Sequence, residues 1–484
     1  KLWNAARFVQ MNLPENFVCE MRSLLGEERF SRLSQALMSS PEVSIRLNHS
    51  KCGESTVEGE PVAWCEEGYY LNERPAFTFD PLLHAGYYYV QEASSMFLHR
   101  VLKQYVSGPV ILLDLCAAPG GKTTTALGAL PEGSIVMCNE PIRPRAKVLA
   151  ENLMKWGNPR VMVTNNYPAD YAKSGLLFDV VVCDVPCSGE GMFRKDEEAR
   201  NGWSEELVAN CSRLQREIVA EAWNCLKKGG YLVYSTCTFN LHEDEENVAW
   251  IREELGGEVL PVDIDDRWGI TSSLKSDELS LPVYRFLPGF TRGEGLFMAV
   301  IRKEGEDKQQ EMTAGKTEKK GKERKKPMRE DRGGTENLWV NPTDSYLFTS
   351  LPPTGERVAL PHDLVPYYKI AEKQLRILTA GVMLGETKGK EMLPHAALAL
   401  STAFRRTAFP EVELSYSEAI SFLRGETLSL KEGVARGMVT VTYLGAPLGF
   451  VKNIGNRANN LYPREWRIKS THLPDEAPQV CIEK

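Results

Sequence analysis

The middle of the chain alternates short apolar runs with stretches of helical periodicity. Between two of these runs, residues 205–226 place apolar side chains at three- and four-residue spacing, which predicts one helix stopped by Gly229-Gly230. Strands that are apolar throughout fill a parallel sheet that helices cover on both faces. The pattern therefore predicts a doubly wound α/β sheet, with a last strand over 295–301, antiparallel at its edge. The runs that predict its parallel strands are 109–114, 134–140, 160–164, 180–184 and 231–235.

The two ends of the chain show shorter and more varied elements. Residues 14–38 predict a helix and residues 43–47 a strand, and turn-rich sequence follows them. Near the other end, 437–443 and 447–451 predict short strands. We therefore expect four parts, which are an N-terminal α+β region over 1–108, a core over 109–303, a linker over 304–336 and a C-terminal α+β region over 337–484.

The linker is set apart by its charge. Residues 302–332 hold twelve Lys or Arg and eight Asp or Glu with hardly an apolar side chain. Such a segment cannot bury enough surface to offset its chain entropy, so we expect a solvated tether. An arm that touches phosphates is the alternative.

Composition limits the class of protein. A single hydrophobic core rarely grows beyond about 250 residues. A chain of 484 residues should therefore form more than one domain. No apolar run approaches the roughly 20 residues that span a bilayer, which excludes a membrane protein. The eleven cysteines form no dense framework and the first residues lack the apolar core of a signal peptide, so we expect free thiols in the cytoplasm. The net charge of -7 argues against bulk coating of nucleic acid, although a local basic face would still bind it.

A loop of small residues follows the first predicted strand, at 114–124. Gly120 and Gly121 let the backbone approach a ligand closely. A phosphate loop would need glycine where Cys116 stands, and Pro119 removes one of the N–H groups that would bind phosphate. The dinucleotide pattern of three glycines is also missing. Glu140 ends the second strand, where an acid accepts hydrogen bonds from ribose hydroxyls. S-adenosyl-L-methionine, which has ribose but no pyrophosphate, is the cofactor that fits best.

Two cysteines follow two of the predicted strands. Cys187 lies in Asp184-Val-Pro-Cys-Ser-Gly and Cys237 in Tyr234-Ser-Thr-Cys-Thr. Ligands bind beyond the carboxyl ends of parallel strands, so both thiols should face one crevice. A thiolate there could add to carbon 6 of cytosine, so that carbon 5 accepts a methyl group. Asp184 would support the ring near N3 and the exocyclic amine. A packing role is the competing interpretation, and these patterns alone leave open which thiol attacks.

Three motifs together resemble the Fmu/Sun family of RNA (cytosine-5) methyltransferases. They are the segments 114–123, 184–195 and 234–239, and with 86–95 they cover the chain from about residue 80 to 301. The resemblance implies a Rossmann-like, S-adenosylmethionine-dependent methyltransferase sheet. It also implies that Cys237 is the nucleophile and that Cys187 helps to release the product.

The resemblance also implies the methyl-donor contacts. The family often carries an Asp beyond the third strand, where this chain has Asn165 and Asn166, and we expect Asn165 to take that place. Arg145 matches a family arginine, although an exposed helix charge would look the same. The full set carried over is Cys116, Ala117, Ala118, Pro119, Gly120, Gly121, Lys122, Glu140, Asn165 and Asp184.

Both ends resemble the bacterial branch of that family that methylates small-subunit ribosomal RNA. The resemblance rests on 13–17, 44–48, 448–452 and 459–464 and implies a C-terminal RNA-binding region similar to a PUA domain. There, basic residues interleave with Tyr462 and Trp466, a pattern that contacts phosphates and stacks on bases. A solvated basic face is the alternative. The basic residues are Lys452, Arg457, Arg464, Arg467 and Lys469.

These observations lead to one main hypothesis and two alternatives. We expect a cytoplasmic, monomeric enzyme that forms 5-methylcytosine in 16S rRNA through a covalent adduct. The alternatives are the same chemistry on tRNA, and a non-catalytic RNA-binding factor for ribosome assembly. We expect no metal, because His84, His242 and His395 have no ligand-like partners. The acidic run 242–247 is expected to begin a helix.

Overall fold

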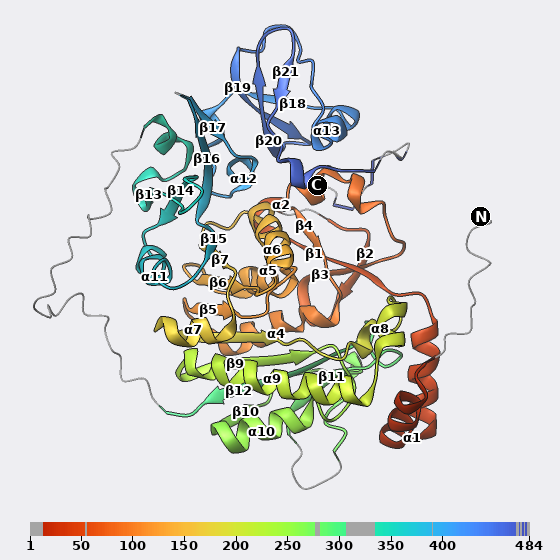
Figure 1. Ribbon diagram of the computed structural model, residues 1–484. Coiled ribbons are helices and arrows are strands. Elements are labelled where there is room, and N and C mark those ends of the chain that lie inside the picture. Colours follow the sequence, from red (N-terminus) through yellow and green to blue (C-terminus); the bar gives the residue numbers. More distant parts are fainter. Residues whose placement is uncertain are drawn as a thin grey trace, which may run out of the picture.

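A computed structural model shows a twisted central sheet with smaller sheets on either side of it in the sequence (Figure 1). It describes residues 13–53, 56–275, 281–305, 334–389, 391–470, 474, 477–478 and 480–481. Most of the predicted linker therefore lies outside the described residues. Among the described residues, the central sheet has nine strands in the order β10-β12-β9-β8-β5-β6-β7-β15, with β11 paired to β12.

Five parallel strands form the middle of this sheet, as the apolar runs predict. Along β8, Val180 and Val182 face one side while Val181 and Cys183 face the other, and all four are buried. Two-sided burial explains why these runs are apolar throughout. The strands are β5 (Ile111–Asp114), β6 (Ile135–Asn139), β7 (Val161–Thr164), β8 (Phe178–Asp184) and β9 (Leu226–Thr236).

Helices cover both faces of the sheet, which confirms the doubly wound α/β fold. Val180 and Val182 pack in one cluster with residues of α4, and Cys138 packs with residues of α6. On the opposite face, Val181 and Cys183 pack with residues of α9. The helices of the first face are α4 (Phe97–Tyr105), α5 (Gly121–Ala129) and α6 (Arg143–Trp156); those of the second are α7 (Pro168–Ser174), α9 (Glu205–Cys225) and α10 (Glu245–Leu255).

Two details near β9 differ from the prediction. Helix α9 ends at Cys225 and runs directly into β9, so the expected stop, Gly229-Gly230, lies inside the strand. A Cβ at Gly230 would lie 2.7 Å from the carbonyl oxygen of Asp179, which explains the glycine there. Strand β12 (Leu296–Lys303) is antiparallel to β9 as expected, but it is not the edge. The short strands β10 (Gly257–Leu260) and β11 (Val283–Phe286) both pair with it.

The N-terminal region contains helix α1 and a four-stranded sheet of order β2-β3-β1-β4. Helix α1 (Glu15–Met38) matches the predicted helix, with a break at Gly26, where φ is 73°. Its Phe17 ring lies 5.0 Å from Phe193 and 5.8 Å from Trp203, so α1 packs against the segment that follows β8. The other elements are β1 (Val43–Leu47), α2 (His49–Cys52), β2 (Gly59–Val62), β3 (Cys65–Leu71), α3 (Pro81–His84), β4 (Tyr88–Val90) and, after β8, α8 (Glu197–Gly202).

The C-terminal region contributes two further four-stranded sheets and one strand of the central sheet. Strand β15 (Ile377–Ala380) pairs antiparallel with β7, although it lies beyond the expected linker. The strands expected over 437–443 and 447–451 are present in β19 (Gly437–Tyr443) and β20 (Ala446–Asn453). The other elements are β13 (Tyr346–Ser350), β14 (Arg357–Pro361), α11 (Val365–Ala371), β16 (Val382–Lys388), β17 (Glu391–Pro394), α12 (Ala396–Leu400), β18 (Glu411–Glu413), α13 (Tyr416–Leu423) and β21 (Ala458–Asn460).

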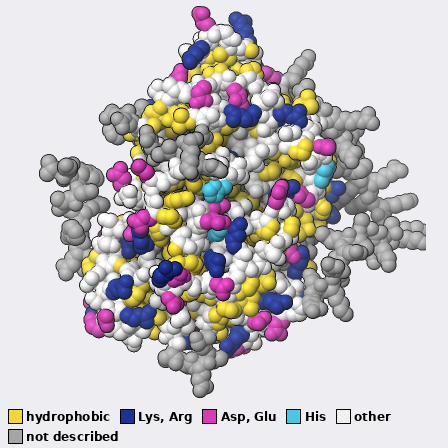
Figure 2. Space-filling model, turned by 180° about the vertical axis from the view of Figure 1, so that it is seen from behind, with side chains coloured by type: hydrophobic (Ala, Val, Ile, Leu, Met, Phe, Trp, Pro, Cys, Tyr) yellow, Lys and Arg dark blue, Asp and Glu magenta, His cyan; other side chains and the backbone are white. Residues whose placement is uncertain are grey.

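The described surface mixes charges of both signs. Figure 2 shows Lys and Arg side chains interspersed with Asp and Glu over the face behind the view of Figure 1. Such mixing is consistent with a small net charge and argues against a single-sign field over that face. Within the described residues, no helix combines the length and the apolar character needed to cross a membrane.

Candidate active site

The structure brings the two cysteines after β8 and β9 into direct contact. The strands are parallel neighbours, with Asp184 opposite Ser235 at their carboxyl ends. The Sγ atoms of Cys187 and Cys237 lie 2.7 Å apart, and the backbone N–H of Cys237 donates to the Cys187 sulfur at 3.4 Å. Both side chains are partly buried. The hydrogen bond to Cys237, together with burial, raises the pKa of the Cys187 thiol well above its usual value.

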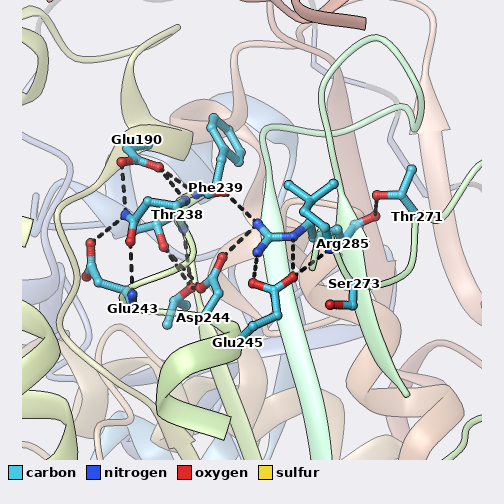
Figure 3. Close-up of polar contacts among 12 residues, drawn as sticks. Glu190, Thr238, Phe239, Glu243, Asp244, Glu245, Thr271, Ser273 and Arg285 are labelled. Carbon is cyan, nitrogen blue, oxygen red and sulfur yellow. Dashed lines mark hydrogen bonds and ion pairs between the residues drawn. The ribbon is translucent and has the colours of Figure 1, made fainter. Parts of the chain in front are cut away.

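A buried polar network ties the two cysteine loops together (Figure 3). Glu190, three residues after Cys187, accepts from the backbone N–H of Phe239 at 2.6 Å and from that of Asn240 at 3.1 Å. The Asn240 amide donates to Glu190 at 3.0 Å and to Glu243 at 2.9 Å. Burial, followed by the charge of Glu243, raises the pKa of Glu190 to about 7. The relative position of the loops is therefore fixed by side chains from both of them.

Asp184 lies beside the thiols and is held by two donors. Lys122 Nζ lies 2.8 Å from one of its carboxylate oxygens, and the Ser235 hydroxyl donates to the other at 2.7 Å. Burial by itself lowers the pKa of Lys122, but the Asp184 carboxylate outweighs it and the pKa ends above its usual value. The pair therefore places a charged ammonium next to the cysteine loops.

A cavity of about 190 Å³ opens between this pair and the loop after β5. Seven of the ten predicted methyl-donor residues line it, whereas Gly120, Glu140 and Asn165 do not. Gly120 precedes α5 with φ 113°, a conformation that favours glycine. The residues that line the cavity are Tyr89, Val90, Gln91, Glu92, Ser95, Asp114, Cys116, Ala117, Ala118, Pro119, Gly121, Lys122 and Asp184.

Glu140 and Asn165 lie next to each other at the ends of β6 and β7. The Glu140 carboxylate accepts from the backbone N–H of Ile142 at 2.9 Å, and its other oxygen lies 3.6 Å from Arg145. Arg145 also donates to the carbonyl oxygen of Ala118 at 3.0 Å. The Asn165 amide donates to the carbonyl oxygen of Glu140 at 2.8 Å. Arg145 and Asn165 thus contact the segments that carry the predicted contacts.

Asp114 is a cavity residue that the set of predicted contacts omits. Its side chain is 1% exposed; one oxygen accepts from Thr123 at 2.6 Å, while the other has no hydrogen-bond partner. Burial raises its pKa to about 7. An unpartnered carboxylate oxygen on the wall of this cavity fits S-adenosylmethionine, whose amino-acid tail carries an ammonium group. The sequence signal for this contact was the acid that ends β5.

Replacing Asp114 with Asn should change how stability depends on pH. The folded protein holds the Asp114 proton up to pH about 7, whereas the unfolded chain releases it at about pH 3.9. The contribution of this proton to the free energy of unfolding is therefore fully present below about pH 3.9 and is lost as the pH rises to about 7. Asn stays neutral throughout. The free energy of unfolding of the variant, relative to that of the native protein, should therefore rise by about 1.4 kcal/mol per pH unit across that window. Thermal unfolding of the cofactor-free proteins from pH 4 to 8 measures this, and a difference independent of pH would contradict it.

Two of the predicted RNA contacts lie in the protein interior. Tyr462 is 2% exposed and Trp466 is 6% exposed, and both belong to the hydrophobic core. They cannot stack on bases, so that expectation is wrong. Alternating aromatic and basic residues also describe a small core with a basic exterior, which is what forms here. Arg457, Arg464 and Lys469 remain exposed.

One cluster of metal-binding residue types occurs among the described residues. Donor atoms of Cys65, Glu67 and His99 lie within 4.8 Å of one another. Glu67 is also paired with the buried guanidinium of Arg46 at 3.0 Å. The charge of the Glu67 carboxylate is therefore already balanced within the protein.

Three family models match the chain in succession. The N-terminal domain of 16S rRNA methyltransferase RsmF matches residues 13–93, and 16S rRNA methyltransferase RsmB/F matches residues 106–302. The methyltransferase RsmF PUA domain matches residues 409–468. The matches thus reach both ends as well as the central sheet.

Solved structures share the fold. The chain is similar to a methyltransferase homolog protein from Pyrococcus horikoshii, with a TM-score of 0.51 and 24% identity over 60% of this chain and 96% of that one. It is also similar to NSun6 from Pyrococcus horikoshii, solved with SFG, with a TM-score of 0.50 and 18% identity over 60% of this chain and 99% of that one. At these identities the likeness shows the fold alone.

Curated relatives match over most of their length. Ribosomal RNA small subunit methyltransferase F of Shigella dysenteriae serotype 1 (strain Sd197) is 31% identical over 429 residues, which is 84% of each chain. The protein of that name from Escherichia coli O157:H7 (strain EC4115 / EHEC) is 30% identical over 430 residues, again 84% of each. The chain therefore belongs to the family of 16S rRNA methyltransferases RsmF.

Proposed function

We propose that this protein forms 5-methylcytosine in 16S rRNA through a covalent bond between Cys237 and carbon 6 of the target base. The observation that carries the proposal is the contact between Cys187 and Cys237, at 2.7 Å, beside the Lys122–Asp184 pair. A methyltransferase that acts on a nucleophilic nitrogen or oxygen needs no thiol. Two thiols next to the cofactor cavity suit a carbon that must first be activated.

The first step is addition of the Cys237 thiolate to carbon 6. The sulfur electron pair forms the new bond, and the ring π electrons shift toward N3. Only one of two thiols this close can ionise readily, because two negative charges at that distance repel strongly. The hydrogen bond to Cys237 and burial raise the pKa of Cys187, which favours the neutral thiol at that position.

The second step transfers the methyl group. The methyl donor is S-adenosyl-L-methionine, which supplies an electrophilic methyl group. Residues of the loop 116–122, with Asp114, Glu140 and Asn165, would hold it. Asp184 would accept from the exocyclic amine of the base, and the Lys122 ammonium beside it would offset negative charge on the ring. Carbon 5 of the enamine would take the methyl group while the bond between that group and the donor's sulfonium sulfur breaks, so that the bonding electrons stay on the sulfur.

The last step restores the aromatic ring and frees the enzyme. The carbon 5 proton leaves to a base, and its bonding electrons form the carbon 5–carbon 6 double bond while the Cys237 thiolate is expelled. Cys187, a neutral thiol in contact with Cys237, is placed to donate a hydrogen bond to the departing sulfur. That contact supports its role in release.

Bisulfite sequencing of ribosomal RNA tests this function. When the gene is deleted, at least one cytosine of 16S rRNA that is methylated in the parent strain should be unmethylated. Reintroducing the native gene should restore that methylation. A copy with Cys237→Ala is the matched control and should not restore it. An unchanged 16S map, or loss of 5-methylcytosine from tRNA instead, would contradict the assignment.

The arrangement of parts supports a division of labour. We propose the boundaries 1–108, 109–303, 304–336 and 337–484, with the PUA-like region binding RNA beside the catalytic core. The family's ribosomal RNA substrate supports action in the cytoplasm on the small subunit or its RNA. We propose further that the enzyme acts as a monomer.

A further inference from the structure

Arg285 is a buried guanidinium that reaches the segment around Cys237 from another strand (Figure 3). It lies in β11, and its side chain has no exposed surface. Its Nη1 donates to the carbonyl oxygen of Phe239 at 2.8 Å and lies 2.8 Å from an Asp244 carboxylate oxygen. Its Nε donates to Glu245 at 3.3 Å. One side chain therefore holds three residues that follow Cys237 closely in the sequence.

Asp244 passes this contact on to the two neighbours of Cys237. Its other oxygen, Oδ1, accepts from the Thr236 hydroxyl at 2.6 Å and from the Thr238 hydroxyl at 3.1 Å. Asp244, Thr236 and Thr238 have no exposed surface. The residues on both sides of Cys237 are thus held by one carboxylate, which in turn faces Arg285.

Folding stability alone does not account for this arrangement. Burying the charged side chains of Arg285, Asp244 and Glu245 costs desolvation energy, and their mutual attraction often does no more than offset this cost. Proteins with apolar residues in place of such a buried ion pair are frequently as stable. Nor does Asp244 make the thiol more reactive, because a nearby carboxylate disfavours ionisation of a thiol. What the contacts supply is a fixed backbone and fixed side chains on either side of the sulfur.

We propose that Arg285 and Asp244 are positioning residues for Cys237, which hold its thiol where it meets carbon 6 of the base. The inference rests on the proposed function, since it takes Cys237 to be the nucleophile. Misplacing a reacting atom by about 1 Å can cost about 10²-fold in rate even when binding is unaffected.

The substitution Asp244→Asn is the first test. Asn has one acceptor oxygen, whereas Asp has two. Residue 244 could then accept either from the two threonine hydroxyls or from Arg285, but not from both. We expect kcat for methyl transfer to RNA to fall by about 10²-fold. The KM values for RNA and for the methyl donor should stay within about threefold, because neither is bound by this residue. Arg285→Lys, which keeps the charge but loses the planar fork, should act in the same direction.

A matched control separates positioning from loss of stability. Asp80 is also buried, at 1% exposure, and accepts from the Tyr88 hydroxyl at 2.6 Å and from the Leu82 N–H at 2.9 Å. Asp80→Asn makes the same chemical change away from the cysteine loops. It should lower the melting temperature while kcat below that temperature stays near the native value. Equal losses of kcat in the two variants at matched stability would overturn the proposal.

Labelling of the Cys237 thiol separates positioning from intrinsic reactivity. Iodoacetamide needs no particular alignment, so the alkylation rate of Cys237, followed by peptide mass spectrometry without RNA, should not fall in Asp244→Asn. An alkylation rate that fell as far as kcat would overturn positioning in favour of altered thiol reactivity.

A milder pair of variants keeps the test valid if Asp244→Asn does not fold. Thr238→Val removes one hydroxyl that Asp244 binds and preserves the shape, so it should slow transfer by about tenfold, equivalent to roughly 1.4 kcal/mol. Thr238→Ser restores the hydroxyl and should rescue the rate. No difference between Val and Ser would overturn the proposal. Methyl transfer by Cys237→Ala would instead refute the proposed nucleophile, which distinguishes the two failures.

Discussion

Cys237→Ala should reduce methyl transfer to RNA by at least about 10⁴-fold, because alanine has no sulfur to add to carbon 6. The variant should also form no covalent species with RNA, whatever the concentration of methyl donor. Incorporation of labelled methyl into RNA measures the first effect. Denaturing electrophoresis of protein mixed with RNA measures the second.

Cys225→Ala is the matched control for this substitution. Cys225 is 1% exposed at the end of α9, and its Sγ donates to the carbonyl oxygen of Glu221 within the same helix. Its loss should affect stability and leave methyl transfer intact. Substantial methyl transfer by Cys237→Ala would refute the covalent mechanism with this nucleophile.

Cys187→Ala should accumulate a covalent complex between protein and RNA. Cys237 would still attack carbon 6 and the methyl group would still be transferred, but the thiol in contact with the departing sulfur would be missing. Turnover should fall while a protein–RNA band that survives denaturation appears in the presence of both RNA and methyl donor. The band should contain methylated cytosine.

The double variant provides the control for the trapped complex. With both cysteines replaced by alanine, the band should disappear, because its bond is made by Cys237. If Cys237→Ala trapped RNA and Cys187→Ala formed no adduct and no product, the roles of the two thiols would be reversed.

The placement of the two thiols follows from features that a sequence displays. Apolar runs that end at Asp184 and Thr236 are strands buried on both faces, and parallel strands bring their carboxyl ends to one edge. That the two strands are neighbours does not follow from these patterns, because it depends on the order of the strands in the sheet. The division of roles between Cys187 and Cys237 comes from resemblance rather than from geometry.

The groups that hold the Cys237 segment could not be predicted in the same way. Asp244 and Glu245 lie at the start of a helix. Acidic residues are common there even when they are exposed, because the helix dipole stabilises negative charge at its N-terminus. Only the pairing of β11 with β12 brings Arg285 to them, and β11 is a four-residue strand without a strong pattern. Long-range partners of this kind follow from tertiary packing.

Tyr462 and Trp466 illustrate the opposite error. Aromatic residues among lysines and arginines suit stacking on bases, but the same residues also fill the core of a small region whose charges point outward. Periodicity over so few residues does not separate these cases.

Strand β15 makes the C-terminal region a protective cover for the central sheet. An open edge strand presents unpaired N–H and C=O groups, which other chains can pair with, and β7 would be such an edge without its antiparallel partner. A shortened chain that ended after β12 would leave that edge available for aggregation. Loss of the C-terminal region in evolution would thus require a new way of shielding the sheet, which ties the inheritance of the two parts together.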